Sequence, residues 1–508
     1  MIRYTVFCAV VLPALVCLLA RPSLAGPKGA AGGKHLINPF FAMDTGLRDG
    51  KHGSPEAKAE TLALLGYDGS DLTGTRGIPA VLKAYDAKGL KLFGLYINVR
   101  IDAGQKYGRQ LKGPIEALDG RDAWLWLAVG SGKHKPSDPA GDEQGVAVIR
   151  EIADLAAESG LRVALYPHTG SWIERVEDAV RVAKKTGRPN VGATFNLCHF
   201  LQVDDEKNLD KALESAAPHL FAVTISGADS GAKGWNRLIQ TLDRGSLDVG
   251  RVVRKLKELH YVGPIGVQGY GIRGDSRENL RRSMSAWRKF AEHLGGRRTD
   301  FLAGGDLGAF RKEAGDWKIA GEVFKDPKDE RRLAWKDGTG SIVNGPKGRT
   351  RNLFTTHEHG DCEAHIEFVV PKGSNSGVYF QGRYEIQVLD SWGVKKLKHG
   401  DCGGIYQRWD RGRGYEGRPP RVNASRKPGA WQSFDVVFRA PRFDKAGKKT
   451  ANACFVKVVH NGIVVHENQE VTGPTRAAAF RDEKPTGPLM FQGDHGPVAY
   501  RNVRIIEK

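Results

Sequence analysis

The chain has 508 residues, of which 40% are hydrophobic, and a formal net charge of +19. This length is typical of two or three domains, and the hydrophobic content is that of a globular protein, which excludes a wholly disordered chain. The 64 glycines indicate many turns and loops, because they follow no period and form no low-complexity tract.

The positive charge alone would fit a protein that binds polyanions such as nucleic acids or acidic polysaccharides. The lysines and arginines are spread along the chain, however, and no nucleic-acid-binding motif accompanies them. We therefore interpret the charge as a solubilising surface and expect no nucleic-acid partner. The sequence gives no indication of the oligomeric state.

Residues 1–25 have the pattern of a secretory signal peptide. Arg3 precedes the apolar stretch VFCAVVLPALVCLLA, and the small residues SLA at 23–25 offer a cleavage site. The apolar stretch is too short for a good membrane span, and no later segment approaches ~20 consecutive apolar residues. We expect an exported protein, periplasmic or extracellular, that has no transmembrane segment and starts near Gly26.

Removal of the signal peptide would leave four cysteines, Cys198, Cys362, Cys402 and Cys454. Export permits disulfides, and the spacing fits no paired C-x-x-C zinc pattern. Two interpretations stay open at this point. Either Cys362 and Cys402 form a bridge, or all four residues are free buried thiols.

Residues 26–36 are rich in Gly, Ala and Lys and are predicted to be flexible. From 37 to 295, short apolar runs alternate with amphipathic segments of helical length. Eight such strand–helix units in about 255 residues predict a (β/α)8 TIM barrel. The runs expected to be strands are 40–44, 67–72, 90–99, 124–130, 161–168, 190–199, 220–229 and 264–271.

A polar, Gly-rich linker is expected over 296–306, and the pattern changes after it. Residues 307–508 lack helical periodicity and contain strand-like runs separated by turn signals, such as CEAHIEFVV, RYEIQVLD and WQSFDVVFRAP. VHNGIV carries the Asn-Gly pair of a two-residue hairpin turn. The second domain is therefore predicted to be an all-β sandwich of the jelly-roll type.

Barrel enzymes place their functional side chains at the carboxyl ends of the strands. Four successive predicted strands end in polar side chains that would converge on one mouth, which predicts a functional pocket there. The candidates are Tyr166, His168, Asn196, His199, Ser226, Asp229 and Gln268.

The stretches VALYPHTG, NVGATFNLCHF and GPIGVQGYGI resemble the sugar phosphate isomerase/epimerase (xylose isomerase-like) barrels, over roughly 37–295. Members of that family commonly hold a divalent metal with two Glu, one Asp and one His at these strand ends. His168 and His199 match positions near the family's substrate contacts. The four metal-ligand positions correspond here to Tyr166, Asn196, approximately Ser226, and Gln268.

All four of these residues are neutral, whereas a hard divalent cation needs anionic oxygen ligands to offset its loss of water. No cofactor is firmly implied, the divalent metal is left open, and Asp229 stays a candidate anionic ligand. We expect a barrel that binds or processes a sugar without a tightly held metal. His168 or His199 could transfer protons, since imidazole titrates near neutral pH.

In the second domain, SNSGVYFQGRYEIQVLDSWG at 374–393 passes from a turn into an alternating strand. A period of two places Arg383, Glu385 and Gln387 on one face. This face is either solvated, with an Arg383–Glu385 ion pair, or the floor of a saccharide site. The later stretches favour a site, because CGGIYQ is a Gly-rich strand that allows close approach and FQGDHGPVAYRN places several polar side chains beside one turn.

Together with NASRKPGAWQSFD, APRFD and NGIVVHEN, these stretches resemble the 3-keto-disaccharide hydrolase domain family, over about 300–508. The resemblance implies a concanavalin-like jelly roll that cleaves glycosides oxidised at C3, by elimination followed by hydration. We expect Glu385 or His495 to act as the base and Arg383 as an oxyanion or substrate clamp. The other expected substrate contacts are Tyr379, Gln381, Gln387, Tyr406 and Gln492.

The sequence therefore predicts an exported enzyme that cleaves 3-keto-glycosides, with an oligosaccharide or oxidised disaccharide as its partner. Two alternatives remain open. One is a non-catalytic carbohydrate-binding protein, which the neutral barrel positions favour and the retained Glu385 and His495 oppose. The other is a sugar isomerase or epimerase whose sandwich only binds glycan.

Overall fold

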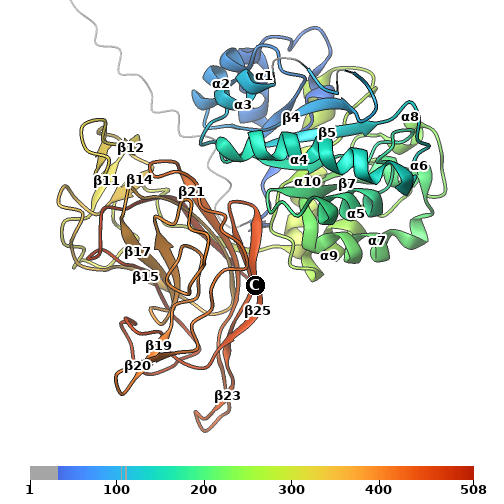
Figure 1. Cartoon of the computed structure of the whole chain (residues 1–508). Coiled ribbons are helices and arrows are strands. Elements are labelled where there is room, and N and C mark those ends of the chain that lie inside the picture. Colours follow the sequence, from blue (N-terminus) through green and yellow to red (C-terminus); the bar gives the residue numbers. More distant parts are fainter. Residues whose placement is uncertain (1–32, 105, 109–110) are drawn as a thin grey trace, which may run out of the picture.

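The computed structural model describes residues 33–104, 106–108 and 111–508. The signal peptide predicted over 1–25 lies outside these residues. Within the described ranges, no helix is long and apolar enough to cross a membrane. The chain folds into a helix-covered barrel beside an all-β sandwich (Figure 1).

The N-terminal domain is the closed parallel barrel that the sequence predicts. Every predicted apolar run overlaps one strand, and the first strand pairs with the last to close the ring. The strands follow chain order around the barrel. They are β2 (Phe40–Ala42), β3 (Gly69–Thr73), β4 (Lys91–Arg100), β5 (Trp124–Gly130), β6 (Arg162–Leu165), β7 (Val191–Asn196), β8 (Leu220–Ile225) and β9 (Ile265–Val267).

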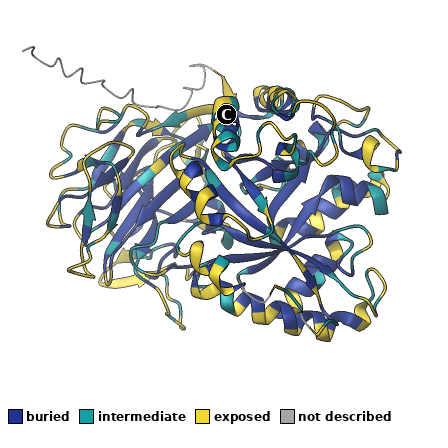
Figure 2. Ribbon diagram, turned by 90° about the horizontal axis from the view of Figure 1, so that it is seen from above, coloured by how far each residue is buried: buried dark blue, intermediate teal, exposed yellow. Residues whose placement is uncertain are grey.

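Helices surround the barrel and turn their apolar faces inward, which leaves their outer faces exposed (Figure 2). Short 3-10 helices lie over Asp44–Leu47, Pro139–Gly141, Glu206–Asn208 and Ala217–His219. The α-helices are α1 (Pro55–Leu65), α2 (Ile78–Asp86), α3 (Lys112–Ala117), α4 (Asp142–Glu158), α5 (Val176–Thr186), α6 (Leu197–Val203), α7 (Leu209–Ala216), α8 (Trp235–Leu238), α9 (Gly250–Glu258) and α10 (Ser276–Leu294).

The C-terminal domain is a sandwich of two antiparallel sheets, which we call the large sheet and the small sheet. The large sheet contains β1 (Lys34–His35), β10 (Gly296–Asp300), β11 (Lys318–Ala320), β14 (Ser341–Val343), β16 (Cys362–Val369), β21 (Gln432–Arg439), β24 (Ala453–His460), β25 (Ile463–Val471) and β27 (Ala499–Glu507). The small sheet has the order β15 (Leu353–His359), β26 (Gly487–Phe491), β17 (Asn375–Phe380) and β18 (Tyr384–Leu389).

Three two-stranded ribbons extend from the sandwich. They are β12 (Val323–Lys325) with β13 (Leu333–Trp335), β19 (Arg408–Asp410) with β20 (Arg413–Tyr415), and β22 (Arg442–Phe443) with β23 (Lys449–Ala451). The predicted hairpin turn joins β24 to β25, where Asn461 and Gly462 both have positive φ (51° and 77°). An Asn-Gly pair tolerates this conformation and so fixes the register of the two strands.

Strand β10 begins inside the segment expected to be a linker. Residues 297–300 pair with β27, and Lys34–His35, from the segment expected to be flexible, pair with Gly296–Arg297. The chain therefore passes from the barrel directly into a strand of the large sheet. The backbone hydrogen bonds of this strand outweigh the turn preference of its Gly-Gly pair.

The four cysteines of the described residues are free and buried, so the Cys362–Cys402 bridge does not form. Burial raises the pKa of the Cys402 thiol to about 12. Cys362 lies 3.4 Å from Nδ1 of His359 instead. These thiols are inert core groups.

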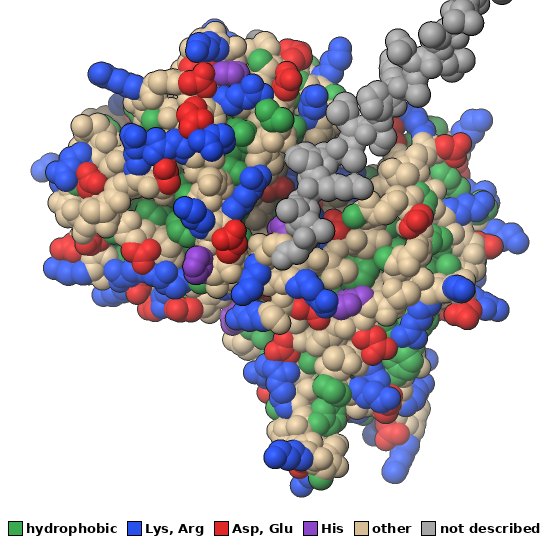
Figure 3. Space-filling view, turned by 180° about the vertical axis from the view of Figure 1, so that it is seen from behind, with side chains coloured by type: hydrophobic (Ala, Val, Ile, Leu, Met, Phe, Trp, Pro, Cys, Tyr) green, Lys and Arg blue, Asp and Glu red, His purple; other side chains and the backbone are tan. Residues whose placement is uncertain are grey.

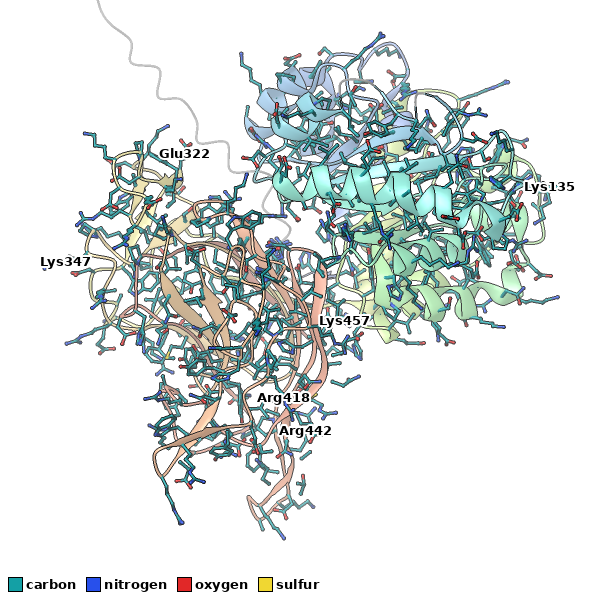
Figure 4. All side chains as sticks on the ribbon, viewed as in Figure 1. Lys135, Glu322, Lys347, Arg418, Arg442 and Lys457 are labelled. Atoms are coloured by element: carbon teal, nitrogen blue, oxygen red, sulfur yellow. The ribbon has the colours of Figure 1, made fainter. Side chains whose placement is uncertain are left out.

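The large sheet packs its outer face against the amino ends of the barrel strands. Lys91, the first residue of β4, pairs with Glu367 at 3.0 Å. Lys457, which lies between the domains (Figure 4), donates to the carbonyl of Leu259 at 3.0 Å. Because the barrel's functional end is the opposite one, its mouth faces away from the sandwich.

Charged side chains are mixed over the molecular surface. Figure 3 shows Lys and Arg scattered over one face with Asp and Glu between them. Many exposed cations are paired, such as Arg121 with Asp86 at 2.7 Å. This distribution agrees with a solubilising role for the excess positive charge.

Candidate functional site

The candidate site of the sandwich lies on the face of the small sheet that points away from the large sheet. Strand pairing sets four side chains in one row across this face, from Phe354 through Met490 and Tyr379 to Glu385. The next row of the same face contains Gln492, Gly377 and Gln387. The alternating pattern of β18 therefore places Glu385 and Gln387 together, as predicted from its period.

Glu385 is a buried carboxyl with one unsatisfied oxygen. The residue is 2% exposed, and its Oε2 atom has no well-formed hydrogen bond to any described group. The buried hydroxyl of Tyr379, directly opposite on β17, also lacks one. Buried polar atoms normally have well-formed partners, so a carboxyl and a hydroxyl that meet only each other, without a well-formed hydrogen bond, mark a candidate ligand site.

Burial raises the pKa of the Glu385 carboxyl to about 8. The neighbouring Tyr379 hydroxyl lowers this pKa in part, and the negative charge of Asp494 raises it further. A carboxyl with such a pKa exchanges protons near neutral pH, which general acid–base catalysis requires.

Gly377 makes room for this carboxyl. A Cβ atom at position 377 would lie 2.3 Å from Oε1 of Glu385 and 3.0 Å from a ring carbon of Tyr379. The side chain of Glu385 therefore leans over the bare backbone of Gly377, between the two glutamines of the second row.

We expect the substitution Gly377→Ala to lower kcat/KM at least ~10-fold, because the new methyl group must displace the carboxyl from its position. The backbone of Gly377 is not in the left-handed region, so the fold should persist. Steady-state kinetics and circular dichroism would measure both effects. Gly360→Ala is the matched control, since its Cβ would meet only ordinary contacts at 3.5 Å or more. Equal kinetics for the two variants would contradict this role.

The remaining predicted contacts border Glu385. Gln387 donates to Oδ1 of Asn375 at 2.8 Å, and the amide N–H of Tyr406 donates to the carbonyl of Glu385 at 3.1 Å. An open hollow of about 460 Å³ lies at the opposite end of the row from Glu385, next to Phe354 and Asp494. His495, whose side chain is 49% exposed, holds Oδ1 of Asp494 at 2.5 Å through Nδ1.

Two predicted residues are engaged in contacts within the fold. Arg383 forms no ion pair with Glu385; its guanidinium binds Asp482 at 3.1 Å and the carbonyl of Gln381, and stacks on Phe480. The amide of Gln381 donates to the carbonyls of His359 and Pro485. Both side chains thus tie the loop around 480–487 to the end of the β17–β18 hairpin.

The barrel mouth brings the predicted histidines together. His168 and His199 lie with their ring centroids 4.3 Å apart, and Tyr166 meets His199 edge-on at 5.6 Å. Burial lowers the pKa of His199 to about 3, and the neighbouring His168 lowers it further. The pKa of His168 is lowered too, by burial. Both imidazoles are therefore neutral at pH 7 and act as hydrogen-bond partners rather than as titrating groups.

The other predicted mouth residues already have partners. Asn196 donates to the carbonyl of Pro167 and accepts from Thr224, and Oε1 of Gln268 accepts from Thr45 at 2.8 Å. Asp229 pairs with Arg237 at 3.0 Å. Ser226 donates to the carbonyl of Leu238.

This donor set does not fit a divalent metal. It is neutral at the four family positions, and the oxygens of Asn196 and Gln268 are already hydrogen-bonded. Among the residues that the structure describes, no group of three or more His, Cys, Asp or Glu is placed to hold a metal ion.

One carboxyl at the mouth, that of Asp71 on β3, was not predicted from the sequence. It is 2% exposed, and burial raises its pKa to about 7. No signal in the sequence singles it out, because a lone carboxyl within a strand has no characteristic spacing.

The fold is that of a two-domain protein, a closed parallel barrel followed by an antiparallel sandwich. Residues 80–290 match the xylose isomerase-like TIM barrel family, and residues 299–506 match the 3-keto-alpha-glucoside-1,2-lyase-like domain family. The chain therefore has an N-terminal xylose isomerase-like TIM barrel and a C-terminal 3-keto-disaccharide hydrolase domain.

Several solved structures are similar to one domain each. A candidate glycosyl hydrolase from Parabacteroides distasonis is 27% identical, covers 41% of this chain and 82% of its own, with a TM-score of 0.31. A 3-keto-D-glucoside 4-epimerase from E. coli is 19% identical, covers 50% and 99%, with a TM-score of 0.42. A D-psicose 3-epimerase from Clostridium cellulolyticum is 15% identical, covers 50% and 99%, with a TM-score of 0.38. No curated protein matches the chain.

Proposed function

We propose that the C-terminal domain cleaves glycosides whose sugar carries a ketone at C3, and that Glu385 is the base. The family match of residues 299–506 supports the substrate class. The observation that carries the role of Glu385 is its buried carboxyl with an unpartnered oxygen on the small sheet. We also propose that the protein is exported, on the pattern of residues 1–25.

The ketone acidifies the hydrogen on C2 of the sugar. The carboxylate of Glu385 takes this proton, and the electron pair of the C–H bond forms an enolate with the C3 oxygen. The enolate then forms a C1=C2 double bond, the C1–O bond to the leaving group breaks, and the leaving oxygen takes up a proton. Water adds its oxygen to C1 while C2 regains a proton, so the net reaction is hydrolysis.

The neighbouring side chains fit the other steps. The amides of Gln387 and Gln492 are the proposed donors to the enolate oxygen or to sugar hydroxyls. His495, held by Asp494 beside the open hollow, is the proposed proton donor to the leaving oxygen. The contacts of Arg383 support a positioning role for this residue rather than an oxyanion contact.

For the barrel we propose sugar binding without a tightly held divalent metal. The neutral, hydrogen-bonded groups at the four family metal positions support this. Because the mouth and the small sheet lie at opposite ends of the molecule, a sugar that visits both sites would pass through solvent.

The test is release of monosaccharide by the purified chain from a 3-keto-disaccharide and from its unoxidised parent, with and without EDTA. We expect release from the keto form only, at a rate that EDTA does not change. Release from neither compound would overturn the catalytic proposal and favour a carbohydrate-binding protein, which glycan titrations would then identify.

A further inference from the structure

A cavity of about 50 Å³ lies where the large sheet packs on the amino ends of the barrel strands. The barrel contributes Lys91, Asp122 and Arg162 to its wall, and the sandwich contributes Asp435 and Lys457. One water needs about 10–15 Å³ of such space, so the cavity has room for a small ion. It is separate from both candidate sites, which lie at the barrel mouth and on the outer face of the small sheet.

The guanidinium of Arg162 is buried and incompletely hydrogen-bonded. Its side chain is 4% exposed, its Nη2 atom donates to Asp122 at 3.0 Å, and its Nε atom has no partner among the described groups. The rings of Trp124 and Phe221 lie 5.4 and 5.3 Å from the guanidinium carbon, and the bare backbone of Gly462 leaves room for the group. Because buried N–H groups normally have acceptors, this one indicates a ligand in the cavity.

The ammonium group of Lys457 has no carboxylate partner within the described part of the chain. It donates to the carbonyl of Leu259 at 3.0 Å, and the residue is only 6% exposed. Burial lowers the pKa of Lys457, and the charge of Glu467 offsets this effect only in part. Since buried charges are normally paired, this side of the cavity needs a negative charge from outside the described residues.

The carboxylates around the cavity are shared between cations. Asp122, which accepts from Arg162, binds a second guanidinium, that of Arg426, at 3.0 Å. Glu367 binds both Lys91 and Arg501, at 3.0 and 2.7 Å. Each of these two carboxylates therefore balances only one of its two cations.

Asp435 is the third carboxylate at the cavity, and it pairs with His365 at 2.6 Å. Together with Lys457, the interface then has five cations for three carboxylates, before any charge on His365 is counted. This excess of positive charge favours an anion in the cavity. The carboxylates in the wall favour a monovalent anion over a divalent one, because they would repel a second negative charge.

We propose that this cavity binds a monovalent anion of the size of chloride, held by the guanidinium of Arg162 and the ammonium group of Lys457. The anion supplies the negative charge that the shared carboxylates lack. Because Arg162 belongs to the barrel and Lys457 to the sandwich, the anion also joins the two domains. The inference does not rest on the proposed function, since neither candidate site includes the cavity.

Thermal unfolding of the full chain, with chloride exchanged for gluconate at one ionic strength, tests the proposal. A fixed ionic strength keeps the screening of surface charges equal, and gluconate is too large for a cavity of about 50 Å³. We expect the melting temperature to rise by a few degrees with chloride and then to saturate, because an ion that binds only the folded state stabilises it.

Anomalous diffraction from crystals of the full chain locates the anion directly and distinguishes its charge. Bromide replaces chloride, and selenate represents the divalent oxyanions. We expect a bromide peak in the cavity between Arg162 and Lys457 and no selenate peak there.

Lys457→Met should abolish both the dependence on chloride and the bromide peak. Lys336→Met is the matched control, because this lysine forms an exposed ion pair with Glu322, and it should keep both effects. If Lys457→Met did not fold, the two measurements on the native chain would still decide. The inference would be overturned by a melting temperature that ignores chloride, by a cavity that holds no bromide or holds selenate instead, or by equal dependence on chloride in the two variants.

Discussion

Replacing Glu385 by Gln is expected to lower turnover of a 3-keto-disaccharide at least ~10²-fold, because the amide cannot accept the C2 proton. Gln has nearly the same shape as Glu and keeps the packing over Gly377. The measurement is kcat and kcat/KM by released monosaccharide. Asp410→Asn is the control, because its carboxyl is largely exposed on the β19–β20 ribbon. Unchanged turnover in Glu385→Gln would remove this residue from the mechanism.

The pH dependence of kcat/KM is a second, independent test of the role of Glu385. Burial raises the pKa of Glu385 to about 8, and only the ionised form can take a proton. For the native chain, kcat/KM should therefore rise with pH toward about 8, and it should fall again at the pH where His495, the proposed proton donor, is deprotonated. A profile without a rising limb toward pH 8 would contradict the role of Glu385 as the base.

The same carboxyl should limit stability. Its pKa is raised from the usual 4.5 to about 8 in the folded state. Stability is therefore unaffected below the unfolded pKa and falls as pH rises from there toward 8, by up to about 1.4 kcal/mol for each pH unit. Glu385→Gln should consequently melt at a higher temperature than the native chain at pH 7, and at a similar temperature near pH 4. If Glu385→Gln were less stable than the native chain at pH 7, this would contradict the interpretation that the Glu385 carboxyl is buried without a compensating charge.

A gain in stability with a loss of activity would distinguish a functional residue from a structural one. Replacement of a residue that stabilises the fold lowers stability, whereas replacement of a strained active-site group raises it. Replacement of Arg383 should instead lower the stability of the chain, since its guanidinium joins the hairpin end to the loop around 480–487.

Periodicity in the sequence was enough to predict the elements. Each apolar run of the barrel overlaps its strand, and the alternation of β18 places Glu385 and Gln387 on one face. These features are local, because the side-chain period of a strand fixes which residues share a face.

Partners distant in the sequence could not be predicted in this way. Arg383 shares the chemistry of a substrate clamp, but it binds Asp482, which lies 99 residues away. Asn196 has the right type and position for a sugar contact, but Thr224 of the next strand occupies its oxygen. Asp71 could not be singled out, because one carboxyl in a strand carries no spacing signal. A residue's type and face follow from the sequence, whereas its availability depends on the packed structure.

Such a distant contact, centred on Asp122, joins the two domains. Its carboxylate accepts from Arg162 of the barrel and from Arg426 of the sandwich, both at 3.0 Å. Both arginine side chains are only 4% exposed, and their Nε atoms have no partner among the described groups. Burial opposes ionisation of Asp122, but the two guanidinium groups hold its pKa well below the usual range. The carboxylate therefore compensates two buried positive charges at once.

We expect Asp122→Ala to destabilise the chain by about 3–5 kcal/mol, because it leaves two buried guanidinium groups facing each other without a counter-charge. Urea unfolding followed by circular dichroism at pH 7 would measure the loss. Asp86→Asn, which breaks an exposed ion pair with Arg121, should cost at most about 1 kcal/mol. The triple variant Asp122→Leu, Arg162→Met, Arg426→Met removes all three charges together and should recover most of the lost stability. If Asp122→Ala cost no more than Asp86→Asn, the barrel and the sandwich would not depend on this buried ion pair for their docking.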